Sequence, residues 1–163
     1  MNVVLISDTH IPSRANRIPE WVRERIRTAD HVIHAGDFDS ADALAAIEDL
    51  ASELTAVAGN MDRALGLPTV ATVDLGGVEF VVTHGTGSKT GYEQRVAKTV
   101  REHASEGPTV GVSGHTHELL DTTVDGVRLL NPGSATGAAP ATSTSMLLAR
   151  VDDGDIAIDV HER

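Results

Sequence analysis

Short apolar, β-branched runs recur along the first two thirds of the chain. Runs of this length and composition predict strands that are buried on one or both faces of a sheet. The runs are Asn2 to Ser7, His31 to Ala35, Leu54 to Ala58, Val78 to Thr83 and Thr109 to Ser113.

Amphipathic patterns between these runs predict three helices. One follows Pro19, a residue favoured in the first helical turn, one follows a Ser40 cap, and one covers Gly91 to Ala104. In each segment apolar side chains recur on one face at helical spacing. These are Ile18, Trp21, Val22, Ile26 and Ala29 in the first, Leu44, Ile47 and Leu50 in the second, and Tyr92, Val96 and Val100 in the third.

The order of the predicted elements changes between the two halves of the chain. Strands alternate with helices over the first 60 residues, which predicts a largely parallel sheet covered by helices. Apolar runs in the second half flank Gly76-Gly77, Asp125-Gly126 and the turn at 152–155, which predicts hairpins. We therefore expect an α/β fold with two packed, mixed sheets and helices outside them. The small-residue stretch Ser134 to Ser145 is expected to be an exposed loop.

Size and charge restrict the classes of function. The 163 residues suit a single domain over 1–163, and a formal net charge of −11 disfavours bulk nucleic-acid binding. With no cysteine, disulfides, thiolate metal sites and cysteine nucleophiles are excluded, which leaves oxygen and imidazole ligands. No apolar run approaches the roughly 18 residues of a membrane span, and the start lacks a basic signal-peptide pattern, so we expect a cytoplasmic protein without membrane contact.

Polar side chains suited to metal binding follow five of the predicted strands. The carboxyl ends of parallel strands lie along one edge of a sheet, so residues more than 100 positions apart are expected to meet in one cleft. The candidate ligands are Asp8, His10, Asp37, Asn60, His84, His115 and His117.

Each of these signals has an ordinary structural alternative when taken alone. Asp8-Thr9-His10 is also typical of a surface loop, Gly59-Asn60 of a turn, and Asp37 of a helix cap. His115 and His117 would also fit an exposed loop. Their coincidence at strand ends favours a shared site. Two carboxylates, four imidazoles and one amide suit two cations that share a bridging carboxylate.

In this order, the motifs resemble those of the calcineurin-like metallophosphoesterase superfamily. The resemblance is closest to its small archaeal and bacterial phosphodiesterases, a branch related to the retromer subunit. It spans nearly the whole chain and includes Asn131-Pro132-Gly133-Ser134. It implies a four-layer α/β/β/α sandwich, with two mixed sheets flanked by helices.

The resemblance also assigns roles to the candidate ligands. It places Asp8, His10 and His117 on a first divalent metal ion, Asn60, His84 and His115 on a second, and Asp37 between them. Mixed nitrogen and oxygen ligation suits Mn, Fe, Ni or Zn better than Mg or Ca and does not distinguish among those four. We expect two Mn ions, with Zn, Fe and Ni as alternatives. The implied activity is metal-dependent hydrolysis of a small phosphodiester by a metal-bridging water, with Asp37, Asn60 and His84 as catalytic residues.

Near the second ligand set the chain departs from the larger family members. In the motif of the larger members, the position of Met61 is taken by a histidine that protonates the leaving group. A thioether cannot donate a proton. We therefore expect a preference for activated or aryl phosphodiesters over alkyl phosphomonoesters.

Other polar residues near the candidate ligands allow two interpretations each. His34, Asp39 and Asp62 could orient ligands or serve in a strand or helix cap, and Arg63 could bind phosphate or be solvated.

A different class of function stays open from sequence alone. The chain could be a catalytically weak scaffold for protein–protein interaction, as the retromer branch implies. The complete ligand set favours an enzyme, and a nuclease acting on short or cyclic nucleotides would be a subclass of it. Few aromatic residues disfavour a stacking surface for single strands. The oligomeric state is not predicted.

Overall fold

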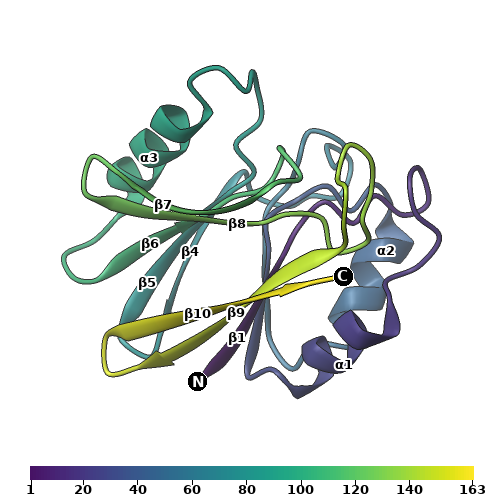
Figure 1. Cartoon of the computed structure of the whole chain (residues 1–163), viewed down its shortest axis with the longest axis horizontal. Coiled ribbons are helices and arrows are strands. Elements are labelled where there is room, and N and C mark those ends of the chain that lie inside the picture. The colour runs from purple at the N-terminus through teal and green to yellow at the C-terminus, as the bar shows by residue number, and fades with distance from the viewer.

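Two five-stranded sheets face each other in the computed structural model, which describes residues 1–163 (Figure 1). The first sheet has the order β10-β9-β1-β2-β3, from β1 (Asn2–Ile6), β2 (His31–His34), β3 (Leu54–Ala56), β9 (Ser145–Asp152) and β10 (Asp155–Glu162). The second has the order β4-β5-β6-β8-β7, from β4 (Val70–Leu75), β5 (Val78–Thr83), β6 (Thr109–Val112), β7 (Leu119–Val124) and β8 (Val127–Pro132).

Each sheet combines a parallel centre with antiparallel hairpins. Strands β1, β2 and β3 pair in parallel, as do β5, β6 and β8. The pairs β4–β5, β7–β8 and β9–β10 are antiparallel hairpins at the predicted turns, and β9 also pairs antiparallel with β1. The prediction of two mixed sheets is confirmed.

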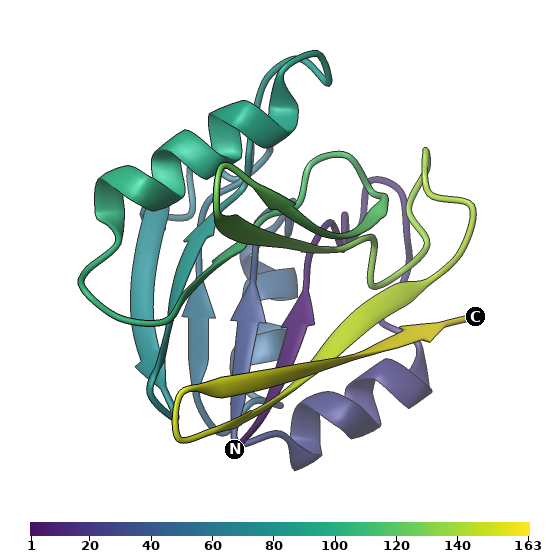
Figure 2. The same cartoon turned by 60° about the vertical axis from the view of Figure 1, so that its left-hand side comes forward.

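Helices cover the outer face of each sheet (Figure 2). Helices α1 (Glu20–Thr28) and α2 (Ala41–Glu48) pack on the first sheet, and α3 (Tyr92–His103) packs on the second. The Ser40 side chain accepts a hydrogen bond from the Ala43 N–H, which confirms the predicted cap of α2. The layers are therefore α/β/β/α, as the family resemblance implies. None of these helices is long and apolar enough to cross a membrane.

The main hydrophobic core lies between the two sheets. It contains 15 buried apolar residues, among them Leu5, Phe80 and Leu130, and two smaller cores lie under the helices. Because both sheets contribute to the central core, the carboxyl ends of their parallel strands are held beside each other at one end of the sandwich.

The expectation of an exposed loop over residues 134–145 is wrong for its first part. Ser134, Ala135 and Ala138 are buried, and the Ser134 hydroxyl donates a hydrogen bond to the Asp8 carbonyl over 2.7 Å. Small side chains let this segment pack closely against the end of β1. Composition alone predicted exposure because it does not show this contact.

Replacing Phe80 tests the importance of the core between the sheets. Phe80 is fully buried, so F80A should lower the free energy of unfolding by about 3–5 kcal/mol. Val160 is 56% exposed, so V160A should change the free energy of unfolding by less than about 0.5 kcal/mol. Urea denaturation measures both, and equal effects of the two variants would contradict this assignment of the core.

Candidate metal centre

The seven candidate ligands lie together at the carboxyl ends of the parallel strands. Asp8 and His10 follow β1, Asp37 follows β2, and Asn60 follows β3 in the first sheet. In the second sheet His84 follows β5, and His115 and His117 follow β6. Ligand atoms from Asp8, His10 and His117 lie within 4.8 Å of one another, as do those from Asp8, Asp37 and His84.

Asp37 lies between the two sets of imidazoles. Its Oδ2 is 3.4 Å from His10 Nε2 on one side and 3.2 Å from His84 Nε2 on the other. Its Oδ1 accepts a hydrogen bond from the Met61 N–H. The Asp37 carboxylate is therefore shared between the imidazoles on its two sides.

Beyond Asp37 the remaining ligand atoms divide into two groups. On one side His117 Nε2 lies 3.3 Å from Asp8 Oδ1 and 3.2 Å from His10 Nε2. The other side is built around the Asn60 amide. Asn60 Oδ1 is 3.2 Å from both His84 Nε2 and His115 Nδ1. Asp8 Oδ1 also lies 3.9 Å from His84 Nε2, so the two groups adjoin at Asp8 as well as at Asp37.

Each histidine of the cluster uses its second ring nitrogen in a hydrogen bond that orients the ring. These bonds run from His10 Nδ1 to Asp39 Oδ1 (2.9 Å), His84 Nδ1 to the Ala35 carbonyl (2.7 Å), His117 Nδ1 to the Ala138 carbonyl (2.8 Å) and His115 Nε2 to the Gly87 carbonyl (2.7 Å). A carbonyl oxygen can only accept, so the ring nitrogen must donate to it. In the neutral imidazole the other nitrogen then faces the centre with a free lone pair, as in metal sites.

One buried oxygen in the cluster lacks a hydrogen-bond donor. Asp8 Oδ2 accepts from the Ser7 hydroxyl and the His115 N–H, whereas the buried Asp8 Oδ1 has no hydrogen-bond partner. Leaving a buried carboxylate oxygen unsatisfied is costly, and a bound cation would remove that cost. The residues present therefore fit a metal-binding centre.

Electrostatic interactions within the cluster favour ionised carboxylates. Burial alone would raise the pKa of Asp8, but the imidazoles of His10, His117 and His84 beside it outweigh burial and lower the pKa. The pKa of Asp37 is also lowered, since His84 outweighs its burial. Conversely, the carboxylates outweigh burial and raise the pKa of His10 and of His84. Both carboxylates are thus charged at neutral pH.

The backbone that presents these ligands adopts unusual conformations. Eight non-glycine residues have positive φ, and six of them lie at this end of the sandwich. Such conformations are disfavoured for residues with a Cβ atom and often mark functional sites. The six are Asp8 (52°), His10 (44°), Asp37 (63°), Asp39 (79°), His115 (72°) and His117 (60°).

Asp62 fixes the loops that carry Asp37 and Asn60. This buried carboxylate accepts hydrogen bonds from four backbone N–H groups, those of Asp37, Phe38, Asp39 and Gly59, at 2.6–3.0 Å. It therefore joins the turn after β2 to the turn after β3. Of the two interpretations from sequence, the structure favours the orienting one.

The other polar residues considered from sequence have distinct places. Asp39 orients His10, as described above. His34 is fully buried, stacks on Phe38 at 3.6 Å and contacts the Thr9 hydroxyl, while burial lowers its pKa to about 3. It supports the loops and does not face the cluster as a ligand. Arg63 is exposed and lines a cavity beside Asn60.

Hydrogen bonds that no sequence pattern indicates hold the loop over residues 114–117. Asn131 Nδ2 donates to the Gly114 carbonyl, to Thr116 Oγ1 and to the Tyr92 hydroxyl. The Tyr92 hydroxyl in turn donates to the Gly114 carbonyl over 2.6 Å. Asn131 could have been recognised from sequence, because it begins the Asn131-Pro132-Gly133-Ser134 motif. Tyr92 could be recognised only as part of the apolar face of its helix.

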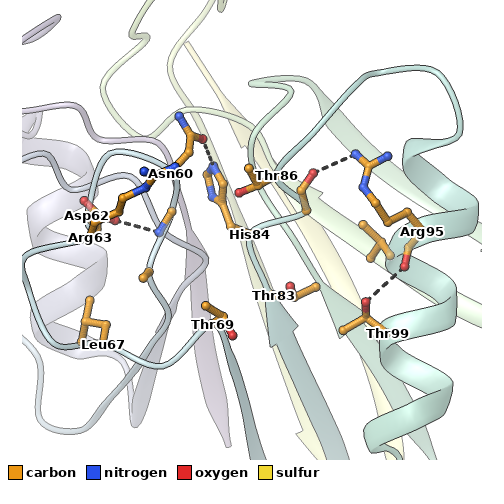
Figure 3. A pocket seen from close by; sticks show the side chains of 14 residues that line it. Asn60, Asp62, Arg63, Leu67, Thr69, Thr83, His84, Thr86, Arg95 and Thr99 are labelled. Atoms are coloured by element: carbon orange, nitrogen blue, oxygen red, sulfur yellow. Dashed lines mark hydrogen bonds between the residues drawn. The ribbon is translucent and has the colours of Figure 1, made fainter.

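A cavity of about 520 Å³ lies beside the cluster (Figure 3). Asn60 and His84 form part of its wall. The rest comes from the loop over residues 58–69, the segment that follows β5, and α3. A molecule in this cavity would therefore touch one side of the candidate metal centre.

Comparison with known proteins identifies the family. A family model described as the calcineurin-like phosphoesterase superfamily domain matches residues 1–154. A protein of Methanothermobacter thermautotrophicus, named a probable metallophosphoesterase, is 36% identical over 154 residues, which are 93% of this chain and 87% of that protein.

Solved structures are similar over the full length of the chain. A Thermotoga maritima protein solved by NMR has a TM-score of 0.75 and 31% identity, with 99% of each chain covered. The Zn²⁺ complex of Entamoeba histolytica Vps29 has a TM-score of 0.79 and 26% identity, with 100% of this chain and 98% of that one covered. Together with the family model, these similarities show that the chain belongs to the calcineurin-like phosphoesterase superfamily.

Proposed function

We propose that this chain is a phosphodiesterase that hydrolyses small phosphodiesters at a centre for two divalent metal ions. The observation that carries the proposal is the buried cluster in which every imidazole is oriented by its outer nitrogen while Asp8 Oδ1 has no donor. Such a cluster is poorly satisfied as a structural core, but it is well suited to cations. The family membership supports hydrolysis of a phosphoester.

The proposed ligand sets are supported by the short distances within the cluster. Asp8, His10 and His117 would hold one ion, Asn60, His84 and His115 the other, and Asp37 would contact both. Mn²⁺ is our first choice among the metals that suit mixed nitrogen and oxygen donors, and Zn²⁺, Fe and Ni are alternatives. When bound, two such ions supply positive charge that lowers the pKa of a water molecule and balances charge developing on phosphate oxygens.

The chain's own contribution is to hold these groups in place before a substrate arrives. Asp39 fixes the ring of His10, and the Ala35 carbonyl fixes that of His84. Asp62 and the Met61 N–H fix the position of Asp37. Groups held rigidly in this way need little reorganisation during the reaction, which is how electrostatic stabilisation lowers a barrier.

Met61 limits which leaving groups the site can expel. Its side chain is 47% exposed next to Asn60, and a thioether carries no proton to donate. Without an acid there, the departing oxygen must leave as a stable anion or take its proton from water. We therefore propose that aryl and other activated phosphodiesters are better substrates than alkyl esters.

The scaffold alternative makes a different prediction about the same cluster. A protein that only binds partners needs no buried, unsatisfied Asp8 Oδ1 and no set of oriented imidazoles. The present arrangement therefore favours an enzyme. A scaffold remains the alternative if the metal-loaded protein hydrolyses no phosphodiester.

Removing the metal ions should abolish the activity. We expect chelator-treated protein to lose hydrolysis of bis(p-nitrophenyl) phosphate and added Mn²⁺ to restore it.

D37N should lower the rate by at least about 100-fold, because it removes the carboxylate shared by both ligand groups. D42N, at an exposed site in the first turn of α2, is the matched control. Mn²⁺ should also raise the melting temperature of the wild type. Full activity in the presence of chelator would rule out the metal mechanism.

Replacing Asp62 should lower the metal affinity of the centre although no candidate ligand is changed. In D62N an amide N–H₂ would face backbone donors that now bind a carboxylate, so we expect a loss of about 1–3 kcal/mol in unfolding free energy. Mn²⁺ affinity should fall about 10-fold or more. Calorimetric titration of Mn²⁺ and urea denaturation measure the two effects. D74N, at an exposed position in β4, should change neither, and unchanged Mn²⁺ affinity in D62N would argue against its positioning role.

Restoring an acid at position 61 tests the account of the leaving group. M61H should raise turnover of a phosphodiester with an alkyl leaving group by at least about 10-fold, since general acids contribute about 10²–10⁴. Turnover of the p-nitrophenyl diester should change little, because that leaving group needs no proton. M61L controls for loss of the thioether. If M61H binds Mn²⁺ normally and gains nothing on the alkyl ester, the account is wrong.

A further inference from the structure

The cavity beside Asn60 and His84 is large enough for a substantial part of a substrate. Its volume of about 520 Å³ lies within the usual range for small-molecule sites. Figure 3 shows Asn60 and His84 near its upper end and Thr83 below them, between the loop on one side and α3 on the other. One arm of a phosphodiester bound at the candidate metal centre can therefore extend into it.

Hydroxyl groups supply much of the lining. Four threonines contribute to the wall: Thr69, Thr83, Thr86 and Thr99. Thr83 is only 9% exposed, and it lines the cavity just below His84 (Figure 3). The Thr99 hydroxyl donates to the Arg95 carbonyl over 3.2 Å. A threonine hydroxyl in a cavity wall can donate to and accept from a hydroxylated ligand.

The cavity wall is also positively charged, unlike the chain as a whole. Two arginines line it, Arg63 and Arg95. The arginines that pair with carboxylates lie elsewhere, at positions 23, 27, 101, 128 and 150. Asp62 is the one carboxylate in the lining, and backbone N–H groups already occupy both of its oxygens. Within a chain of net charge −11, this cavity is therefore a local site for an anion.

Arg95 is held at the rim with bonding capacity to spare. Its Nη2 donates to the carbonyls of Gly85 (3.0 Å) and Ser88 (2.9 Å), which fixes the guanidinium. Its Nε is buried and has no hydrogen-bond partner. Because Nε has no accessible surface, only the outer N–H groups of this fixed guanidinium could reach a phosphate in the cavity.

Phe, Tyr and Trp are missing from the cavity wall, and the one ring in it, that of His84, belongs to the candidate metal centre. Its apolar lining residues are Ala58, Leu67 and Val96, and no Phe, Tyr or Trp contributes. A nucleobase is usually bound by stacking on such rings, so a nucleoside arm would gain little here. The lining therefore favours a hydroxylated, non-aromatic group.

We propose that this cavity binds one ester arm of the substrate and selects an arm that carries hydroxyl groups and a second phosphate, as in a glycerol phosphate or sugar phosphate. The inference rests on the proposed phosphodiesterase function and names its substrate class. Arg63 would bind the second phosphate, Arg95 would add positive charge on the opposite wall, and Thr83 would bind a hydroxyl. The cavity determines which ester arm binds in it, and the proposal does not specify whether the bond to that arm or the bond to the other arm is broken.

Direct binding to chelator-treated protein tests the cavity apart from the metal ions. Glycerol 3-phosphate, inorganic phosphate and glycerol are titrated separately in a calorimeter. We expect glycerol 3-phosphate to bind at least about 5-fold more tightly than either of the others, since only it uses both kinds of lining group. Equal affinity for glycerol 3-phosphate and inorganic phosphate would overturn the selection for a hydroxylated arm.

Variants locate the binding. R63M should weaken glycerol 3-phosphate binding about 10-fold, through loss of a charge-assisted hydrogen bond. T83V should weaken it about 3- to 10-fold while changing inorganic phosphate binding less. R101M removes an equal charge from an exposed position of α3 outside the cavity lining and should change nothing. Unchanged binding in both R63M and T83V would place the ligand elsewhere and overturn the proposal.

The Mn²⁺-loaded protein separates failure of this proposal from failure of the proposed function. There, glycerol 3-phosphate should inhibit hydrolysis of bis(p-nitrophenyl) phosphate competitively, and R63M should raise its inhibition constant about 10-fold. Hydrolysis without such inhibition overturns the proposal for the cavity alone. If the aryl diester is not hydrolysed but glycerol 3-phosphate still binds through Arg63 and Thr83, the proposed phosphodiesterase function fails and the cavity remains a binding site.

Discussion

Asp8 carries a negative charge into a position with no exposed surface, and four parts of the chain converge on it. Its N–H donates to the Gly36 carbonyl, and its own carbonyl accepts from the Ser134 hydroxyl. Its Oδ2 accepts from Ser7 and from the His115 N–H, which belongs to the other sheet. Because burial of a charge is costly, this network and the imidazoles around it require the two sheets to keep one relative position.

The turns around the centre depend on support from groups that are not ligands. Residues with a Cβ atom at positive φ cost about 1–3 kcal/mol each, and six of them gather here. Asp62 holds the turns after β2 and β3, while Asn131 and Tyr92 hold the loop after β6. The apolar core between the sheets provides the rigid base for these strained turns. Precision at the centre is thus a property of the whole sandwich.

Much of the fold follows from local sequence patterns. Apolar runs, helical spacing and turn residues predict the strands, hairpins and helices because each depends on neighbours within a few positions. The seven candidate ligands could also be predicted to converge, since each directly follows a strand. Their proximity in the structure agrees with that expectation. Their roles as ligands and catalytic residues remain proposals.

Other features depend on contacts between distant residues, and no local pattern contains them. Asp62 resembles any loop carboxylate until its four backbone partners are known, and Tyr92 resembles any apolar helix residue. The small residues from Ser134 onward indicated exposure, whereas in the fold Ser134, Ala135 and Ala138 are buried beside the end of β1. The same contact has a consequence for synthesis. β1 and Asp8 are made first, but β9 and Ser134, their partners, are made more than 120 residues later. On the ribosome the central strand must therefore wait unpaired on one side, and the sandwich can close only when nearly the whole chain has emerged.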